Sequence, residues 1–135
     1  MKPEIFQGRS ICAGFAEGKA LVAKQGISFW GGVDLETGII TEVGHDLYGA
    51  QMQGRILVLP ALKGSAGGMW IIIRLAVNRK GPNAIVVQSA DTILVGAVIM
   101  GGIPTVDSLP GDVFRKIKSG DMLKVDGTQG TVAFM

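Results

Sequence analysis

The feature that most constrains the fold is a strand, a glycine-rich turn and a helix that follow one another in the middle of the chain. The run 56–59 is entirely apolar and ends at Pro60, a pattern typical of a buried strand. The turn 61–68 contains three glycines and leads into the apolar run 69–77, which predicts a helix. A further apolar run at 84–87 predicts a second strand, so the sequence indicates a βαβ unit with parallel strands.

The glycine-rich turn also has the residue types of an anion site. Ser65 is its only hydroxyl and Lys63 its only charge, and backbone N–H groups at a helix start favour negative charge. The turn is neither a nucleophile elbow, since Lys63 replaces the glycine required two places before the serine, nor a P-loop, since the order is Lys-Gly-Ser. A structural alternative is that the glycines only allow close helix packing and Ser65 is the N-cap. By itself, the turn favours this alternative.

Composition predicts one globular domain, residues 1–135. Hydrophobic residues make up 47% and charged residues 18%, which excludes a disordered chain. A net charge of +2 with scattered basic residues and only 6% aromatics argues against nucleic-acid binding. The N-terminus has no signal-peptide pattern and no apolar run spans a bilayer, so we expect a cytoplasmic protein without membrane contact.

The chain has one cysteine, Cys12, and one histidine, His45. A disulfide framework and a metal cluster with ligands from this chain alone are therefore excluded. A Ser-His relay would depend on His45, for which the general expectation is a turn or surface residue. Asp34, in the loop 31–38, is interpreted either as an Asx-turn residue or as a carboxylate that orients a substrate.

The flanking segments predict short elements separated by glycine turns. The segments 8–14 and 19–23 predict a hairpin joined at 15–18, and the helix from 69 is expected to end at 78–82, where basic residues precede Gly and Pro. Further expected elements are a strand at 39–43, a short helix, favoured over a strand, at 92–100, a strand at 103–106, a short helix or turn at 113–116, and a hairpin of 122–125 and 131–134. Together they predict an α+β fold, a half-open barrel-like sheet flanked by two or three helices.

Several short motifs occur in a fixed order over nearly the whole chain. They are ISFWGGVD at 27–34 followed by ETG at 36–38, HDLYG at 45–49, GRILVLP at 54–60, KGS at 63–65, GAV at 96–98 and IPTVD at 103–107. Each motif is weak alone. In this order they resemble the small subunit of aconitase X, also called the aconitase X swivel domain.

The resemblance implies the swivelling β/β/α fold of the fourth domain of aconitase and of the isopropylmalate isomerase small subunit. It also implies a hydro-lyase completed by a separate large subunit, as a heterodimer or larger assembly. The large subunit would carry the iron–sulfur cluster, and this chain would carry no cofactor. Family substrates are mevalonate 5-phosphate and cis-3-hydroxy-L-proline. The Ala/Gly-rich turn followed by Trp70 departs from the common Arg-Gly-Lys-Gly-Ser pattern toward some bacterial two-subunit members, so the substrate stays open.

The resemblance further implies roles for residues of the turn. Dehydration of a 3-hydroxy acid needs a base for the α-proton and a Lewis acid for the leaving hydroxyl, which iron in the partner would supply. Aconitase uses a serine on a turn of its swivelling domain as the base, which implies that Ser65 is catalytic here. The substrate-binding residues would be Lys63, Gly64, Gly67, Gly68 and Asp34.

Two other classes of protein are alternatives to a dehydratase subunit. A phosphohistidine carrier shares a swivelling architecture but needs a histidine on a Gly/Thr-rich turn, a setting that His45 lacks. A non-catalytic interaction domain with a purely structural glycine loop is the second alternative.

Four large apolar residues lie beside the glycine loops, Phe29, Trp30, Met69 and Trp70. They predict a surface patch that contacts the large subunit, with burial of the tryptophans in the core as the alternative.

Overall fold

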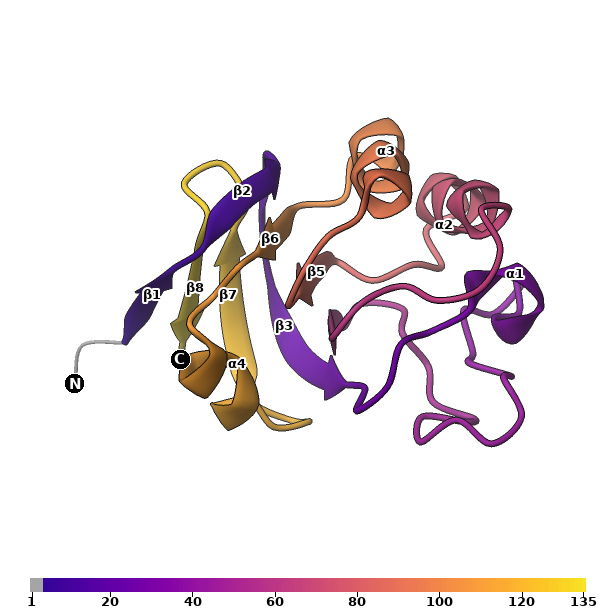
Figure 1. The fold of residues 1–135 in the computed structure, drawn as a ribbon, viewed down its shortest axis with the longest axis horizontal. Helices are drawn as coiled ribbons and strands as arrows, with labels where there is room; N and C mark the ends of the chain where they lie inside the picture. Colours follow the sequence, from indigo (N-terminus) through magenta and orange to yellow (C-terminus); the bar gives the residue numbers. More distant parts are fainter. Residues whose placement is uncertain (1–3) are drawn as a thin grey trace.

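A computed structural model describes residues 4–135, which form an eight-stranded sheet and four helices (Figure 1). The strand order is β1-β8-β7-β3-β4-β5-β6-β2. The strands are β1 (Ile5–Gln7), β2 (Arg9–Cys12), β3 (Phe15–Val22), β4 (Ile56–Leu59), β5 (Ala84–Val87), β6 (Thr105–Asp107), β7 (Met122–Asp126) and β8 (Thr131–Phe134). The helices are α1 (Phe29–Gly32), α2 (Gly68–Val77), α3 (Thr92–Gly101) and α4 (Gly111–Lys116).

The sheet curls because its two edge strands are consecutive in sequence. β1 pairs antiparallel with β8 and β2 pairs antiparallel with β6, although only Gly8 separates β1 from β2. A side chain at Gly8 would clash with the carbonyl of Asp107, so glycine allows the strand to pass from one edge to the other. The predicted barrel-like sheet is confirmed by this arrangement.

The predicted N-terminal hairpin is wrong. Residues 15–18 lie inside β3 rather than in a turn, and β3 pairs with β7 and β4. β2 instead bonds to β6, with Arg9 opposite Asp107. The chain turns at 13–14, where Gly14 has a φ of 125°. The predicted strand at 39–43 is reduced to isolated bridges at Ile39 and Ile40.

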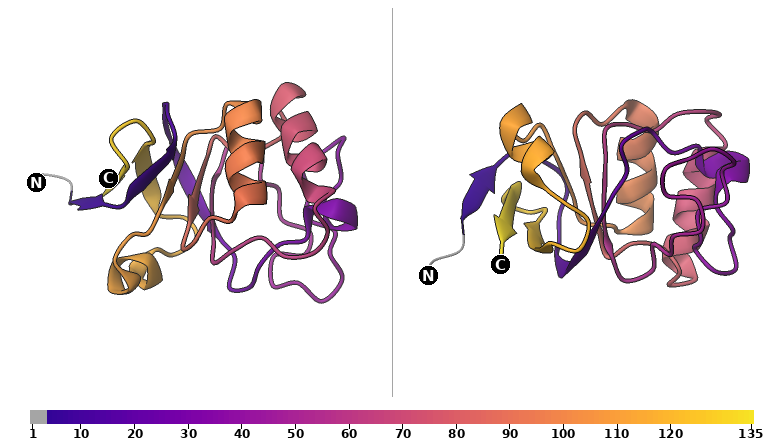
Figure 2. Two further views of the ribbon diagram at one scale, coloured as in Figure 1. Left: turned by 45° about the horizontal axis from the view of Figure 1, so that its top comes forward. Right: turned by 90° about the horizontal axis from the view of Figure 1, so that it is seen from below.

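The central βαβ prediction is confirmed: β4, β5 and β6 are parallel neighbours, with α2 and α3 between them in sequence. All four residues of β4 are buried, and alternate side chains enter two cores. Ile56 and Val58 face the barrel core, while Leu57 and Leu59 face the core beneath the helices. Figure 2 shows α2 and α3 side by side on one side of the sheet, with α4 at the other end of the molecule.

Asp107 joins the barrel strand β6 to two other segments. Its buried carboxylate accepts hydrogen bonds from Nε and Nη2 of Arg9, at 2.9 and 2.8 Å, and from the backbone N–H of Ala90, at 3.0 Å. Burial acts to raise the pKa of Asp107, but the hydrogen bonds from Arg9, Ala90 and Ser108 and the charge of Arg9 outweigh it and lower this pKa. Asp107 therefore contributes stability above its unfolded pKa, about 3.9, and this contribution is lost as the pH falls toward the folded value.

Asp107→Ala is expected to reduce the free energy of unfolding by about 2 kcal/mol at pH 7, because charge-assisted hydrogen bonds are lost while Arg9 returns to water. The difference from wild type should shrink when the pH is lowered below about 4. Urea unfolding at pH 7 and pH 3 measures both values. An equal difference at the two pH values would show that the ionised carboxylate is not what stabilises the fold.

Candidate active site

The glycine-rich turn lies at the carboxyl edge of the parallel strands, where β4 and β5 end and α2 and α3 begin. Ligands of α/β sheets commonly bind at this edge. A small pocket opens there, and it is lined by Phe29, Leu62, Lys63, Gly64, Ser65, Gly68, Asp91 and Ile93. The structure therefore brings together four of the six predicted site residues, Lys63, Gly64, Ser65 and Gly68, whereas Gly67 and Asp34 do not line this pocket.

Ser65 is exposed and its hydroxyl closes the turn before α2. The Oγ atom accepts a hydrogen bond from the N–H of Gly67 at 3.0 Å. The N-cap position of α2 is occupied by Gly67, which has no side-chain capping bond, so Ser65 lies two residues before it and its hydroxyl accepts an N–H of the turn. An N–H donor and the start of a ten-residue helix both favour negative charge at the Ser65 oxygen.

The glycines of the turn let it pack closely on the segment 28–30. Gly64 has a φ of 87°, and a side chain there would clash with the hydroxyl of Ser28. A Cβ atom at Gly67 would lie 2.9 Å from the ring of Trp30, and one at Gly68 would lie 3.3 Å from Cβ of Phe29. Close packing therefore accounts for all three glycines, and their predicted role as donors to a substrate stays a prediction.

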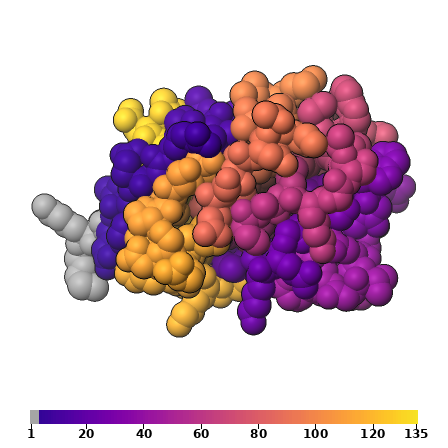
Figure 3. Space-filling model, in the orientation of Figure 1, coloured from indigo at the N-terminus to yellow at the C-terminus, as the bar shows by residue number. Residues whose placement is uncertain are grey.

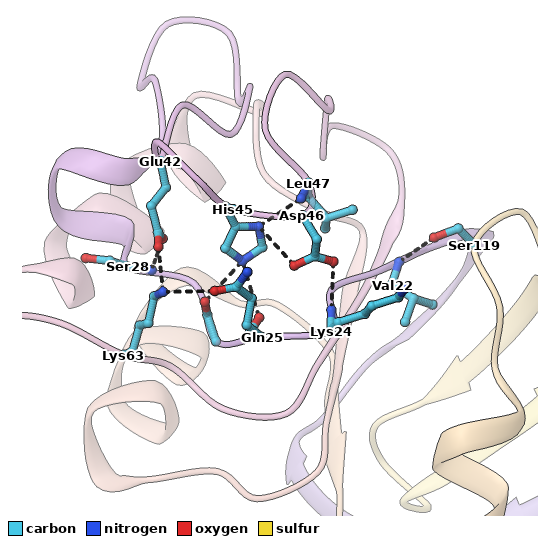
Figure 4. Close-up of polar contacts among 11 residues, drawn as sticks. Val22, Lys24, Gln25, Ser28, Glu42, His45, Asp46, Leu47, Lys63 and Ser119 are labelled. Carbon is cyan, nitrogen blue, oxygen red and sulfur yellow. Dashed lines mark hydrogen bonds and ion pairs between the residues drawn. The ribbon is translucent and has the colours of Figure 1, made fainter.

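Lys63 is held by an acidic residue that the sequence analysis did not single out (Figure 4). Its Nζ atom lies 2.6 Å from Oε2 of Glu42 and donates to Oε1 of Gln25 at 3.4 Å. The other carboxylate oxygen of Glu42 accepts the N–H of Ser28 at 2.9 Å. Burial acts to raise the pKa of Glu42, but the hydrogen bonds from Lys63 and Ser28 and the positive charge lower it. Nothing in the sequence around residue 42 indicated this contact, because its partners come from distant loops.

His45 is a turn residue, as expected, but it is buried rather than on the surface. Its Nδ1 atom accepts the N–H of Leu47 at 2.9 Å, which leaves Nε2 to donate to the carbonyls of Gln25 and Gly26 at 3.3 and 3.1 Å. Both ring nitrogens are therefore engaged, and Nδ1 also lies 3.4 Å from Oδ1 of Asp46. A phosphohistidine carrier needs an accessible nitrogen, so this geometry argues against that class.

Of two aspartates in the neighbouring loops, Asp91 borders the Ser65 pocket and Asp34 does not. Asp34 forms an Asx turn, with its carboxylate accepting the N–H of Glu36 at 2.9 Å, and it lines a separate hollow with Trp30 and Arg74. Asp91, which the sequence analysis missed, caps α3 by accepting the N–H of Leu94 at 2.8 Å and lines the Ser65 pocket. An aspartate directly before the apolar run at 92 was the available signal.

The residues present do not fit an iron–sulfur cluster. Clusters are held by several cysteine thiolates. Cys12 is the single cysteine, its Sγ lies 3.4 Å from the carbonyl of Val98, and burial raises the pKa of its thiol. Within residues 4–135, no three His, Cys, Asp or Glu side chains gather as metal ligands. None of the helices in that range has the length and apolar character needed to cross a membrane.

A sheet rolled toward a barrel, with two helices on its parallel strands and a serine turn at their carboxyl edge, defines a swivelling β/β/α domain. The family model described as Aconitase X swivel domain matches residues 5–134. The chain belongs to this family, which confirms the predicted resemblance and, with it, the class of dehydratase small subunit.

Two curated relatives share a name and match this chain over nearly their whole length. The phosphomevalonate dehydratase small subunit of Methanocella arvoryzae is 44% identical, over 93% of this chain and 96% of that protein. The phosphomevalonate dehydratase small subunit of Thermococcus kodakarensis is 43% identical, over 96% and 95%.

Two solved structures share the fold. The crystal structure of Thermococcus kodakaraensis aconitase X in its holo-form superposes with a TM-score of 0.92 at 42% identity, over 98% of each chain. The solution NMR structure of a UPF0107 protein gives a TM-score of 0.90 at 39% identity, over 98% of this chain and 99% of that one. The predicted swivelling fold is thereby confirmed.

Proposed function

We propose that this chain is the small subunit of a phosphomevalonate dehydratase and that it contributes Ser65 as the base of an active site shared with a large subunit. The exposed Ser65 hydroxyl, bonded to the Gly67 N–H at the start of α2, is the observation that carries this proposal. The names of the relatives at 43–44% identity support mevalonate 5-phosphate as the substrate over cis-3-hydroxy-L-proline.

The proposed chemistry is an elimination across C2 and C3 of the hydroxy acid. Ser65 Oγ takes the proton from C2, the C2–H electron pair becomes the second bond between C2 and C3, and the C3–O bond breaks. The leaving hydroxyl takes a proton from solvent and departs as water, and Ser65 afterwards returns the C2 proton to solvent. A serine acts as base only if its oxyanion is stabilised, which the Gly67 N–H and the helix start provide.

The other predicted site residues take binding roles in this proposal. Lys63, whose side chain is 43% exposed, would bind an anionic group of the substrate while Glu42 holds it from the other side. The backbone N–H of Gly64 would add a donor, whereas the N–H groups of Gly67 and Gly68 already bond to the hydroxyl and the carbonyl of Ser65. Asp34 lies outside the pocket, so its replacement should affect turnover less than replacement of Lys63.

The iron–sulfur cluster expected from the family belongs, in this proposal, to the large subunit, because this chain lacks the ligands. We expect the assembled enzyme in the cytoplasm. The alternative, a non-catalytic interaction domain, would keep the same fold and the same partner but would not need the Ser65 hydroxyl.

Coexpression with the large subunit of the same organism, followed by assay of purified complex, tests the proposal. Dehydration of mevalonate 5-phosphate, with no turnover of cis-3-hydroxy-L-proline, is the expected result. Turnover of the hydroxyproline alone would overturn the substrate assignment. Turnover that does not change in Ser65→Ala would favour the interaction domain.

The predicted contact patch needs one correction. Phe29 is 2% exposed and packs in the core, so its place in the patch is wrong, while Trp30 and Trp70 are 58% and 55% exposed. Met69 is half-buried. Figure 3 shows the segments that carry the two tryptophans, in purple and rose, as neighbouring surface at the right-hand end of the molecule.

Replacing both Trp30 and Trp70 with serine is expected to weaken binding of the large subunit by at least about tenfold, since exposed tryptophans are frequent interface hot spots. The melting temperature should change little, because both side chains are exposed. Val77→Ser, at the far end of α2 and also exposed, is the matched control. Affinity measured by surface plasmon resonance that is equal for the double variant and the control would place the interface elsewhere.

A further inference from the structure

Three segments distant in sequence meet at the carboxylate of Glu42. The Oε1 atom accepts the backbone N–H of Ser28 at 2.9 Å, and Oε2 pairs with Nζ of Lys63 at 2.6 Å (Figure 4). The Glu42 side chain is 17% exposed, and a Cβ atom at Gly32 would lie 3.2 Å from its Cβ. Exposed ion pairs contribute little to stability. A largely shielded carboxylate that accepts hydrogen bonds from two different loops, however, fixes the position of the two loops relative to each other.

Both partners of Glu42 lead directly to the Ser65 turn. Lys63 precedes Ser65 by two residues, and its N–H also donates to the carbonyl of Ile27 at 3.2 Å. Ser28 packs against Gly64 so closely that a side chain at Gly64 would clash with the Ser28 hydroxyl. A shift of Ser28 or Lys63 would therefore move the backbone that presents Ser65.

We infer that Glu42 is a positioning residue for the Ser65 turn, acting through Lys63 and Ser28. Glu42 holds the ammonium of Lys63 at one place and offsets its charge, so that Lys63 meets an anionic substrate from a fixed position. The kinetic consequences of this role rest on the proposed function, whereas the contacts of Glu42 with Lys63 and Ser28 lie within this chain and do not depend on it.

Glu42→Gln, which keeps the shape and removes the charge, separates this role from a structural one. We expect kcat to fall about tenfold as the turn loses its anchor. The KM for mevalonate 5-phosphate should fall by a few-fold, because the charge of Lys63 is no longer offset. Partial unfolding would lower the active fraction without lowering KM. Glu36→Gln, in the same region and exposed, is the matched control and should keep wild-type kinetics.

A double-mutant cycle with Lys63→Met tests the route through Lys63. The amide oxygen of glutamine can still accept the N–H of Ser28, so the Glu42→Gln change acts mainly through Lys63. We therefore expect it to have little further effect on kcat or KM once Lys63 is replaced, because the effects of interacting residues are not additive. Additive effects, or a KM for Glu42→Gln that is unchanged or higher, would overturn the inference.

A measurement on the chain alone keeps this inference separate from the proposed function. In ¹⁵N correlation spectra, Glu42→Gln should shift the amide signals of Gly64, Ser65 and Gly67, and Glu36→Gln should leave them in place. Shifts confined to residues 28 and 41–43 would overturn the positioning role. Failure of the wild-type complex to dehydrate mevalonate 5-phosphate would instead overturn the proposed function, and the spectra would still decide the role of Glu42.

Discussion

Replacing Ser65 with alanine is expected to lower kcat of the two-subunit enzyme by about a hundredfold to ten-thousandfold, the usual cost of losing a general base. The hydroxyl is exposed and its removal costs one hydrogen bond, from the N–H of Gly67, so the fold should stay intact. The start of α2 and the backbone donors remain. Substrate binding, measured as KM or as a dissociation constant, should therefore weaken much less than turnover.

Two further variants test whether the loss of turnover is specific to the Ser65 hydroxyl. Ser89→Ala removes an exposed serine from the neighbouring loop after β5 and should leave kcat unchanged. Lys63→Ala should raise KM more than it lowers kcat, if its ammonium binds an anionic group of the substrate. Steady-state kinetics of the reconstituted complex measure all three. If kcat of the Ser65→Ala enzyme is within a few-fold of the wild-type value, the hydroxyl has only a structural role, as the acceptor of the hydrogen bond inside the turn.

The centre of the fold was predictable because its signals are local. The run 56–59 is apolar and is ended by Pro60. Gly67 directly precedes α2 and Asp91 directly precedes α3, so the start of each helix is indicated by neighbouring residues. The prediction of an N-terminal hairpin was wrong because β2 pairs with β6, in which Asp107, the partner of Arg9, lies almost a hundred residues later in the chain. Strand propensity identifies such a segment as β but does not identify its partner.

In the candidate site too, residues with a local sequence signal were predicted and residues without one were missed. Ser65 and Lys63 were identified because a hydroxyl and a charge stand alone in a glycine turn between a strand and a helix. Glu42 was not, because it lies in a loop without periodicity and reaches its partners only after the chain has folded. Phe29 was expected on the surface with Trp30, but Gly68 lets α2 pack against Phe29 and bury it.

The isolated chain is expected to bind no iron–sulfur cluster and to show no dehydratase turnover, whereas the complex with the large subunit shows both. The reason lies in the two side chains best suited to bind iron. Cys12 is half-buried against the Val98 carbonyl with a raised pKa, which disfavours the thiolate, and both nitrogens of His45 are already hydrogen-bonded. Each chain should be incubated anaerobically with iron and sulfide, desalted, and examined by visible absorbance and iron content. The large subunit treated in the same way is the control that establishes the reaction conditions. A stable cluster at stoichiometric occupancy on the small chain alone would contradict the division of labour between the subunits, and with it the proposal that this chain supplies the base while its partner supplies the cluster.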